Sequence, residues 1–376
     1  MDTAHPTTAS MCQSWSSIDQ LRMGVSEMKI TAIGLDLAKN VFQVHGVDER
    51  GHVVVRKQLK RHQVLPFFAN LQACLIGMEA CGGFHYWARA IEKLGHQVRA
   101  MAPQFVKPYV KANKNDRNDA EAICEAVQRP SMRFVPVKSI EQQGILQLHR
   151  SRKLLVGMRI GLTNHLRGLL AEFGIVMPQG AKELPKRLPE ILEDGANGLL
   201  GITRQMMMGV LEHYRELVQR IAEIERMIQI WHRDNEASKR LAEIPGVGPL
   251  TATAMVGMIG DARAFKNGRQ LAAYLGLVPR QNSSGGKEKL LGISKRGDGY
   301  MRTLLVHGAR AVIRSTQTRM AAGKVSKEEW LPRLLGRCHI NEAAVAQANK
   351  TARIIWALLA HQRTYSPAGH QMAAMA

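Results

Sequence analysis

The sequence has no long hydrophobic run. None of its apolar stretches approaches the roughly 18 residues of a membrane-spanning helix, and residues 1–27 lack the apolar segment of a signal peptide. Lys and Arg are dispersed rather than gathered into one amphipathic helix, which argues against a membrane-surface protein. We therefore expect a cytoplasmic protein that contacts no membrane, with residues 1–27 as a disordered extension.

Cysteine is scarce and forms no CxxC pair. The five cysteines lie in mostly apolar surroundings. An odd number without metal-ligand spacing favours a reducing compartment over a disulfide framework, and it argues against structural zinc. The cysteines are Cys12, Cys74, Cys81, Cys124 and Cys338.

Acidic residues are in the minority. Asp and Glu number 31 against 52 Lys and Arg, which gives a net charge of +21 and a pI near 10.1. Such an excess describes partners rather than fold, and nucleic acid is the first candidate. With 376 residues, 45% of them hydrophobic, the chain is long enough for two or more packed domains.

The first third of the chain alternates strand and helix patterns. Three strand-like runs come first, followed by strand–helix alternation and a helix that begins near Arg117. This order predicts an α/β domain over residues 28–137 with a mixed sheet, antiparallel first and parallel later. The expected strands are 29–36, 41–47, 52–59, 74–79 and 97–103, and the expected helices before Arg117 are 62–72 and 85–93.

After about residue 138 the strand signals stop, so the fold class is α/β plus all-α. Two sets of apolar residues recur at helical spacing and predict a helical hairpin or coiled coil over residues 138–238, with a connecting loop at 174–190. The sets run from Leu155 to Phe173 and from Val210 to Trp231. A mainly helical domain is expected over 239–365, closed by an apolar helix at 343–360, with a tail at 366–376.

Two carboxylates follow predicted strands. Asp36 ends the strand IGLD, where Ala32, Gly34 and Asp36 share one face and leave room beside the carboxylate. A charge there needs a partner or a cation. Glu79 ends the strand LIGME; if the two strands are neighbours, the carboxylates converge, and otherwise Glu79 is a solvated strand end.

Two further carboxylates stand three residues apart in a basic stretch. Asp116 and Asp119 lie at the expected start of a helix, where such a pair is usually a cap with a favourable dipole interaction. Four carboxylates at the ends of consecutive elements instead suit two Mg²⁺ ions about 3.5–4 Å apart and phosphodiester cleavage. The neighbouring Lys111, Lys114 and Arg117 would then contact phosphates.

Two glycine-containing segments have a composition that is typical of phosphate-binding segments. IPGVGP at 244–249 resembles a helix–hairpin–helix turn, in which Gly246 and Gly248 would expose N–H groups to a DNA backbone, or it is a plain helix connection. Residues 276–305 read as a flexible loop rich in cations. These cations are Arg280, Lys287, Lys289, Lys295, Arg296 and Arg302. Ser283 and Ser284 within it read from spacing alone as an exposed turn.

The ordered set of motifs resembles the DEDD transposases of bacterial insertion sequences, the bridge-RNA-guided recombinases with a RuvC-like N-terminal domain. The matching motifs run from residue 29 to about 362: IGLDLAK, GMEACGG, KNDRNDA, IPGVGPLTA, LAAYLGLVPR and SSGGKEKLLGISKRGDGYMR. The family's first strand usually starts near the initiator, so the 27-residue extension departs from its pattern, and Met28 is an alternative start.

The resemblance implies a mechanism. The family's four acidic ligands correspond to Asp36, Glu79, Asp116 and Asp119, and its catalytic serine corresponds to Ser284, with Ser283 in reserve. It further implies Mg²⁺, a covalent phosphoserine–DNA link, double-stranded DNA ends and target as substrates, a structured guide RNA, and a dimer that assembles into a tetramer.

Three alternatives remain at this point. A RuvC-like junction nuclease would use the acidic residues and water, without the serine. An actin-like ATPase or sugar kinase would need a second glycine-rich phosphate loop, which residues 130–330 lack. A nucleic-acid scaffold without catalysis would tolerate loss of Asp36 or Asp119.

Overall fold

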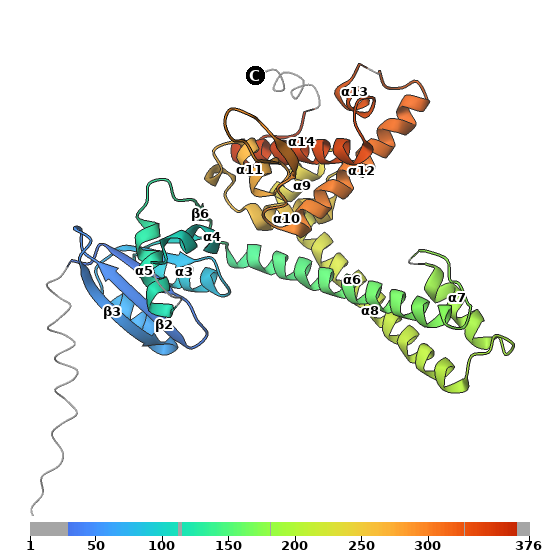
Figure 1. Ribbon diagram of the computed structural model, residues 1–376, viewed down its shortest axis with the longest axis horizontal. Helices are drawn as coiled ribbons and strands as arrows, with labels where there is room; N and C mark the ends of the chain where they lie inside the picture. Colours follow the sequence, from blue (N-terminus) through green and yellow to red (C-terminus); the bar gives the residue numbers. More distant parts are fainter. Residues whose placement is uncertain (1–28, 112–114, 181, 327, 367–376) are drawn as a thin grey trace, which may run out of the picture. The chain divides into compact units, whose positions relative to one another are not determined.

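The computed structural model in Figure 1 describes residues 29–111, 115–180, 182–326 and 328–366. The expected disordered extension and most of the predicted tail lie outside these residues. The chain divides into two compact units, with the boundary between Val137 and Lys138. Each unit is described by itself below.

The N-terminal unit is built on a six-stranded sheet in the order β3-β2-β1-β4-β5-β6. Strand β1 pairs antiparallel with β2 and parallel with β4, β2 pairs antiparallel with β3, and β4 pairs parallel with β5. This confirms the predicted mixed sheet. The two-residue strand β6 was not predicted, because two residues show no periodicity. The strands are β1 (Ala32–Asp36), β2 (Val41–Val47), β3 (Val53–Lys60), β4 (Leu75–Glu79), β5 (Gln97–Met101) and β6 (Phe134–Val135).

Helices cover both faces of this sheet, as in the RNase H-like arrangement. Ile33 and Leu35 of β1 pack in one core with Phe68 of α2 and Trp87 of α3. Ala32, on the opposite face of β1, packs against Cys124 of α5. The alternation predicted for β1 is therefore present. The helices are α2 (Val64–Ala69), α3 (Phe84–Glu92), α4 (Pro103–Val106) and α5 (Asp116–Val127), with short 3-10 turns η1 (Arg61–Gln63) and η2 (Lys107–Tyr109).

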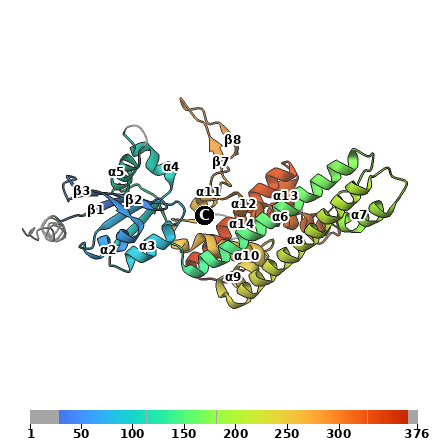
Figure 2. The ribbon, with the colours of Figure 1, turned by 90° about the horizontal axis from the view of Figure 1, so that it is seen from below.

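Two long helices, α6 (Ile140–Ala171) and α8 (Gly201–Asp234), lie side by side in the C-terminal unit (Figures 1 and 2). Their predicted apolar positions are buried at Leu166, Leu217 and Ile221. The guanidinium of Arg152 on α6 binds Glu225 on α8, with Nη2 2.6 Å from Oε1. The helical periodicity thus marked buried positions of α8, whereas in the first set Met158 is exposed on α6 and Phe173 is exposed beyond its end.

Between the two long helices, the expected loop at 174–190 is wrong in its second half. Residues Glu183–Glu193 form α7. Leu184, Leu188 and Leu192 are buried at intervals of four, which is a helical repeat. Pro185 lies in the first turn, where its missing N–H leaves no hydrogen bond unmade, whereas Pro189 lies inside the helix and removes one backbone donor. The helix forms despite Pro189 because it buries the three leucines.

The rest of the C-terminal unit packs helices around two cores. The main core contains Leu241, Met255, Leu271, Leu305 and Ile355, and a smaller one contains Ile313, Leu331 and Ala343. The elements are α9 (Glu236–Ala242), α10 (Pro249–Ile259), η3 (Ala262–Ala264), α11 (Gly268–Tyr274), α12 (Gly299–Ala321), α13 (Trp330–Leu335) and α14 (Ile340–His361). Among the described residues no helix is both long and apolar enough to cross a membrane.

One element in this unit overturns the expectation that strands stop after residue 138. Strands β7 (Pro279–Gln281) and β8 (Leu290–Ile293) form an antiparallel hairpin. Figure 2 shows this hairpin projecting beyond the helices of its own unit. The segment 276–305, read as a flexible loop, therefore contains an ordered ribbon over 279–293 and the start of α12 at Gly299.

Candidate functional site

Three of the four predicted carboxylates meet at the end of strand β1. Ligand oxygens of Asp36, Asp116 and Asp119 all lie within 4.8 Å of one another. Asp36 is the last residue of β1, and the other two lie in the first turns of α5. We call these three residues the acidic cluster.

Two glycines explain why α5 can deliver its carboxylates to Asp36. A Cβ at Gly34 would lie 2.0 Å from the carbonyl oxygen of Ala120, and one at Gly77 would lie 2.7 Å from Val127 Cβ. Gly34 and Gly77 are register partners on neighbouring strands. Together they form a flat floor on which α5 lies directly against the sheet. The room predicted beside Asp36 is thus occupied by a helix.

The cap of α5 is not supplied by an aspartate. The Asn115 side chain accepts a hydrogen bond from the backbone N–H of Asn118 at 2.8 Å. Asn115 therefore satisfies the helix end, and Asp116 and Asp119 are not needed as caps. The signal was present in the sequence, since an asparagine preceding a helical pattern is a typical cap.

The electrostatics of Asp36 show that the cluster lacks compensating charge. Burial raises its pKa to about 6, and repulsion by Asp119, Asp116 and Glu79 adds to the rise. The backbone N–H of Leu37 donates to the carboxylate and opposes the shift. A bound cation would relieve this repulsion.

Glu79 stands beside the acidic cluster rather than inside it. The parallel register pairs Leu35 with Met78, so Glu79 follows on the neighbouring strand next to Asp36. Its charge acts on Asp36, but it does not join the group whose oxygens lie within 4.8 Å. The structure therefore brings three of the four predicted ligands together.

The donor set suits a hard divalent cation. Carboxylate oxygens are the ligands that Mg²⁺ prefers, and burial, followed by repulsion from the neighbouring carboxylates, raises the pKa of Asp36 at the same place. The acidic cluster is consistent with metal use.

The basic residues near the cluster have different surroundings. Lys111 Nζ lies 3.1 Å from Glu125 and 3.6 Å from Glu121, and its pKa is raised chiefly by Glu125. Part of its charge is therefore already paired within the protein. Arg117 is exposed on α5, whereas Lys114 lies outside the described residues.

Ser284 lies at the tip of the β7–β8 hairpin. It bridges to Lys287 across Gly285 and Gly286, which have φ values of 56° and 76°. Positive φ at both central residues defines a type I′ turn, the turn that matches the twist of paired strands. The Gly-Gly pair was therefore a hairpin signal that the reading of a flexible loop missed.

The two serines differ in their hydrogen bonds. Ser283 Oγ accepts from the backbone N–H of Lys289 at 3.3 Å. Within the described residues, the Ser284 hydroxyl has no hydrogen-bond partner, and its residue is exposed. The structure thus leaves Ser284 the freer of the two.

The cations predicted around the hairpin divide into two groups. Arg280, Lys287 and Lys289 lie on the hairpin and are exposed, as are Lys295 and Arg296 at its base. Arg302 instead donates from Nη1 to the carbonyls of Leu275 at 3.0 Å and Arg296 at 2.9 Å. Its guanidinium thus links the end of α11 to the residues that follow the hairpin.

The two glycines of IPGVGP also differ. Gly246 has φ of 82°, and a Cβ there would lie 2.7 Å from the Gly308 carbonyl of α12. Close helix packing therefore explains Gly246. Gly248 is exposed at the start of α10, where no side chain caps the helix, so its position suits the predicted phosphate contact better.

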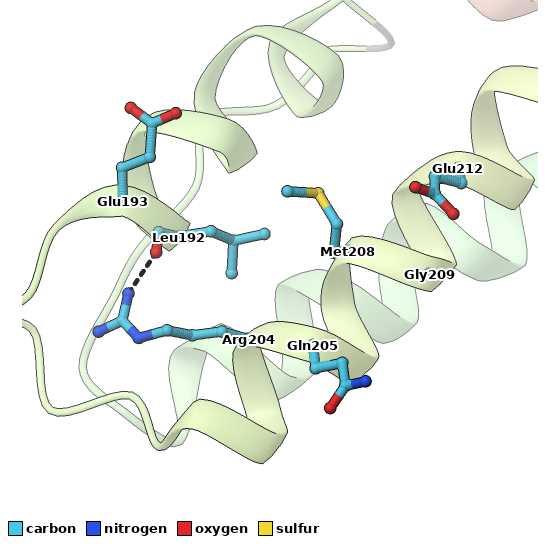
Figure 3. Close-up of a pocket in the computed structure, with 7 residues that line it drawn as sticks. All are labelled: Leu192, Glu193, Arg204, Gln205, Met208, Gly209 and Glu212. Carbon is cyan, nitrogen blue, oxygen red and sulfur yellow. Dashed lines mark hydrogen bonds between the residues drawn. The ribbon is translucent and has the colours of Figure 1, made fainter.

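A hollow of about 540 Å³ lies between α7 and α8, and none of the predicted site residues lines it (Figure 3). Arg204 in its wall donates to the carbonyl of Leu192 at the end of α7. The same guanidinium also binds Asp194 and Asn197. These hydrogen bonds fix the connection between α7 and α8. The residues around the hollow therefore have a structural role.

Comparison with known sequences matches both parts of the chain. The family described as "Transposase" matches residues 33–175, and the "Transposase IS116/IS110/IS902 family" matches residues 238–323. The first match contains the acidic cluster and the second contains the serine hairpin. The chain belongs to the IS110/IS1111 family of DEDD transposases.

Similar transposases extend over nearly the whole chain. A "Probable family 20 transposase" of Pseudomonas aeruginosa is 51% identical over 90% of this chain and 100% of its own length. The "Transposase for insertion sequence element IS1111A" of Coxiella burnetii is 46% identical over 92% and 93%, respectively. The corresponding protein of IS1328 in Yersinia enterocolitica is 42% identical over 90% and 99%.

Proposed function

We propose that this transposase cuts and rejoins DNA strands through a phosphoserine intermediate formed by Ser284. The observations that support this proposal are an acidic cluster of three carboxylates in the N-terminal unit and an exposed serine at the tip of a hairpin in the C-terminal unit. The serine oxygen forms an ester with the scissile phosphorus, the hydroxylic proton leaves, and the deoxyribose oxygen departs as a hydroxyl. One phosphate ester bond breaks and one forms in this step. A second deoxyribose hydroxyl can therefore attack the phosphoserine, release the serine and rejoin the strands.

The residues proposed for this step come from both units of the chain. Asp36, Asp116 and Asp119, with Glu79 beside them, would hold one or two Mg²⁺ ions. Bound Mg²⁺ supplies positive charge to the phosphate oxygens. Lys287 and Lys289 add positive charge near Ser284, which stabilises the negative charge on the phosphate oxygens during the attack.

The nucleophile can be tested by trapping the covalent adduct on labelled DNA in a denaturing gel. Ser284→Ala is expected to abolish the adduct while DNA binding persists, and Ser283→Ala is expected to retain it. An adduct that survives in Ser284→Ala but not in Ser283→Ala would reassign the nucleophile. Adduct formation in both single variants would place it elsewhere.

We further propose that the acidic cluster of one copy acts with the serine of another, within a dimer that pairs into a tetramer. Mixing Asp119→Asn with Ser284→Ala then tests this arrangement. A shared site places the intact cluster of one variant against the intact serine of the other and restores activity. A site made within one chain stays inactive in the mixture.

Other nucleic-acid contacts are proposed from charge and exposure. Arg117, Gly248, Lys295 and Arg296 are exposed and suit phosphate contacts, whereas Lys111, Gly246 and Arg302 already have structural partners. The net charge of +21 exceeds what one DNA site needs and supports a structured guide RNA as a second partner. RNA-dependent choice of target DNA, measured by strand-joining with and without that RNA, tests this proposal.

A RuvC-like junction nuclease is the second candidate, because the acidic cluster lies entirely within the N-terminal unit. In that case water replaces the serine. Ser284→Ala would then hydrolyse branched DNA at the wild-type rate. Loss of all strand cleavage in Ser284→Ala would exclude it.

A further inference from the structure

The β7–β8 hairpin has no packed face. Every residue from 279 to 292 is exposed, including Leu290, whose side chain is 64% exposed. A lone two-stranded ribbon is marginally stable in water, so one that buries nothing is suited to lie against a partner. The hairpin carries three cations, Arg280, Lys287 and Lys289, against one carboxylate, Glu288. This excess of positive charge favours nucleic acid as the partner over a protein surface with few acidic residues.

The register of the hairpin sorts its side chains into two faces. Gln281 pairs with Leu290, and Ser284 pairs with Lys287. Asn282 N–H donates to the Lys289 carbonyl, so the register is unbroken between these pairs. Cross-strand partners share a face, and residues three apart on one strand lie on opposite faces. The serine face therefore carries Asn282, Ser284, Lys287 and Lys289, and the amide face carries Gln281, Ser283, Glu288 and Leu290.

The serine face fits a phosphate backbone. Lys287 lies opposite Ser284 on this face and Lys289 lies opposite Asn282. Attack on phosphorus requires that this face meet the DNA strand. The amide face must then point away from the attacked backbone. A two-stranded ribbon fits the major groove of duplex DNA, and side chains there that do not meet the phosphates are within reach of base edges.

We propose that Gln281 and Leu290 read the base pairs beside the phosphate that Ser284 attacks. The Gln281 amide has no hydrogen-bond partner among the described residues and can bind adenine N6 and N7 at once. Leu290 offers an apolar contact to a neighbouring thymine methyl group. This inference rests on the proposed function of Ser284 for its placement, and it adds protein-read base specificity at the cleavage point.

The test measures binding of the full-length protein, without RNA, to a pool of duplexes randomised at the central positions. Wild-type protein is expected to enrich A·T pairs at one or two adjacent positions. Gln281→Ala should lose about tenfold of that preference. The matched controls Asn282→Ala and Leu291→Ala alter the opposite face and should keep it.

A charge-switch variant guards against misfolding. Gln281→Glu should move the preference from A·T toward C·G, because a carboxylate accepts from cytosine N4. Unfolding of the ribbon cannot produce a new preference. Replacing Lys287 and Lys289 by Gln should instead weaken binding to all sequences and lower the salt slope by about two.

The proposal is overturned if wild-type protein shows no base preference, or if Gln281→Ala and Gln281→Glu enrich the same sequences as wild type. It fails separately from the catalytic proposal. Ser284→Ala should keep the wild-type base preference, since binding needs no covalent step. Conversely, adduct formation that persists without any base preference would leave the serine mechanism standing alone.

Discussion

Asn115 caps helix α5 through a 2.8 Å hydrogen bond from the Asn118 N–H to its side chain. In the sequence KNDRNDA, the aspartates could serve either as helix caps or as metal ligands, and this bond distinguishes the two roles. The helix end is satisfied without a carboxylate, so Asp116 and Asp119 are available to a cation and to Asp36.

Asn115→Ala should destabilise the protein by about 1 kcal/mol, because one helix-end N–H loses its acceptor. Asp119→Asn should leave the melting temperature in metal-free buffer unchanged or raised, since it removes repulsion from Asp36. Thermal melts of both variants check this. A large loss of stability in Asp119→Asn would return the aspartate to the role of a cap.

Mg²⁺ should raise the melting temperature of the wild-type protein, because a ligand that binds only the folded state stabilises it. The rise should disappear in Asp36→Asn and shrink in Asp119→Asn. Glu79→Gln should weaken the rise less, because Glu79 lies outside the cluster of three. Equal Mg²⁺ responses in all four proteins would argue against a metal at these residues.

Gly34→Ala should destabilise the N-terminal unit by about 1–3 kcal/mol or more, because its methyl group would meet the Ala120 carbonyl at 2.0 Å. Gly82→Ala is the matched control, since a Cβ there meets nothing within 4 Å. Chemical denaturation measures the difference in the free energy of unfolding between the two variants, and hydrogen exchange of α5 shows whether the loss is at this helix. Equal stability of the two variants would contradict the glycine floor.

The C-terminal unit should lose stability as pH falls. His149 is buried between Tyr300 and Thr253, at 3.0 Å from each, and burial lowers its pKa to about 4. The unfolded chain, with a pKa near 6.5, therefore binds the proton more readily. The stabilisation is complete above about pH 6.5 and falls toward pH 4, by on the order of 3 kcal/mol in full.

Hydrogen exchange of α6 and α10 between pH 7.5 and 5 measures this dependence. His149→Gln should flatten the profile while lowering stability at neutral pH. A wild-type profile that is flat over this range would show that His149 titrates normally.

Gly285 should tolerate asparagine but not valine. Asn-Gly sustains a type I′ turn, whereas a β-branched residue at positive φ is strained. If Ser284 is presented by this turn, Gly285→Val should lower adduct yield well below that of Gly285→Asn. Similar yields from both variants would show that turn geometry does not position the serine.

The periodicity of the sequence determined the strands β1 to β5, the helices α5, α6 and α8, and the side of β1 on which Asp36 lies. These are local properties, since alternation by two and by three to four residues follows from backbone geometry. Charge and motif order pointed to nucleic acid and to the family. Proline content misled at α7, where buried leucines at intervals of four outweighed it.

Tertiary structure alone decided which of the chemically similar residues are free. Lys111 and Arg302 look like phosphate contacts in the sequence, yet acidic and carbonyl partners brought from elsewhere engage them. Gly246 looks exposed but packs on Gly308, which lies 62 positions further along the chain. Ser283 and Ser284 are adjacent, and only strand register puts them on opposite faces. Contacts between distant segments depend on packing, which the local pattern of residues does not contain.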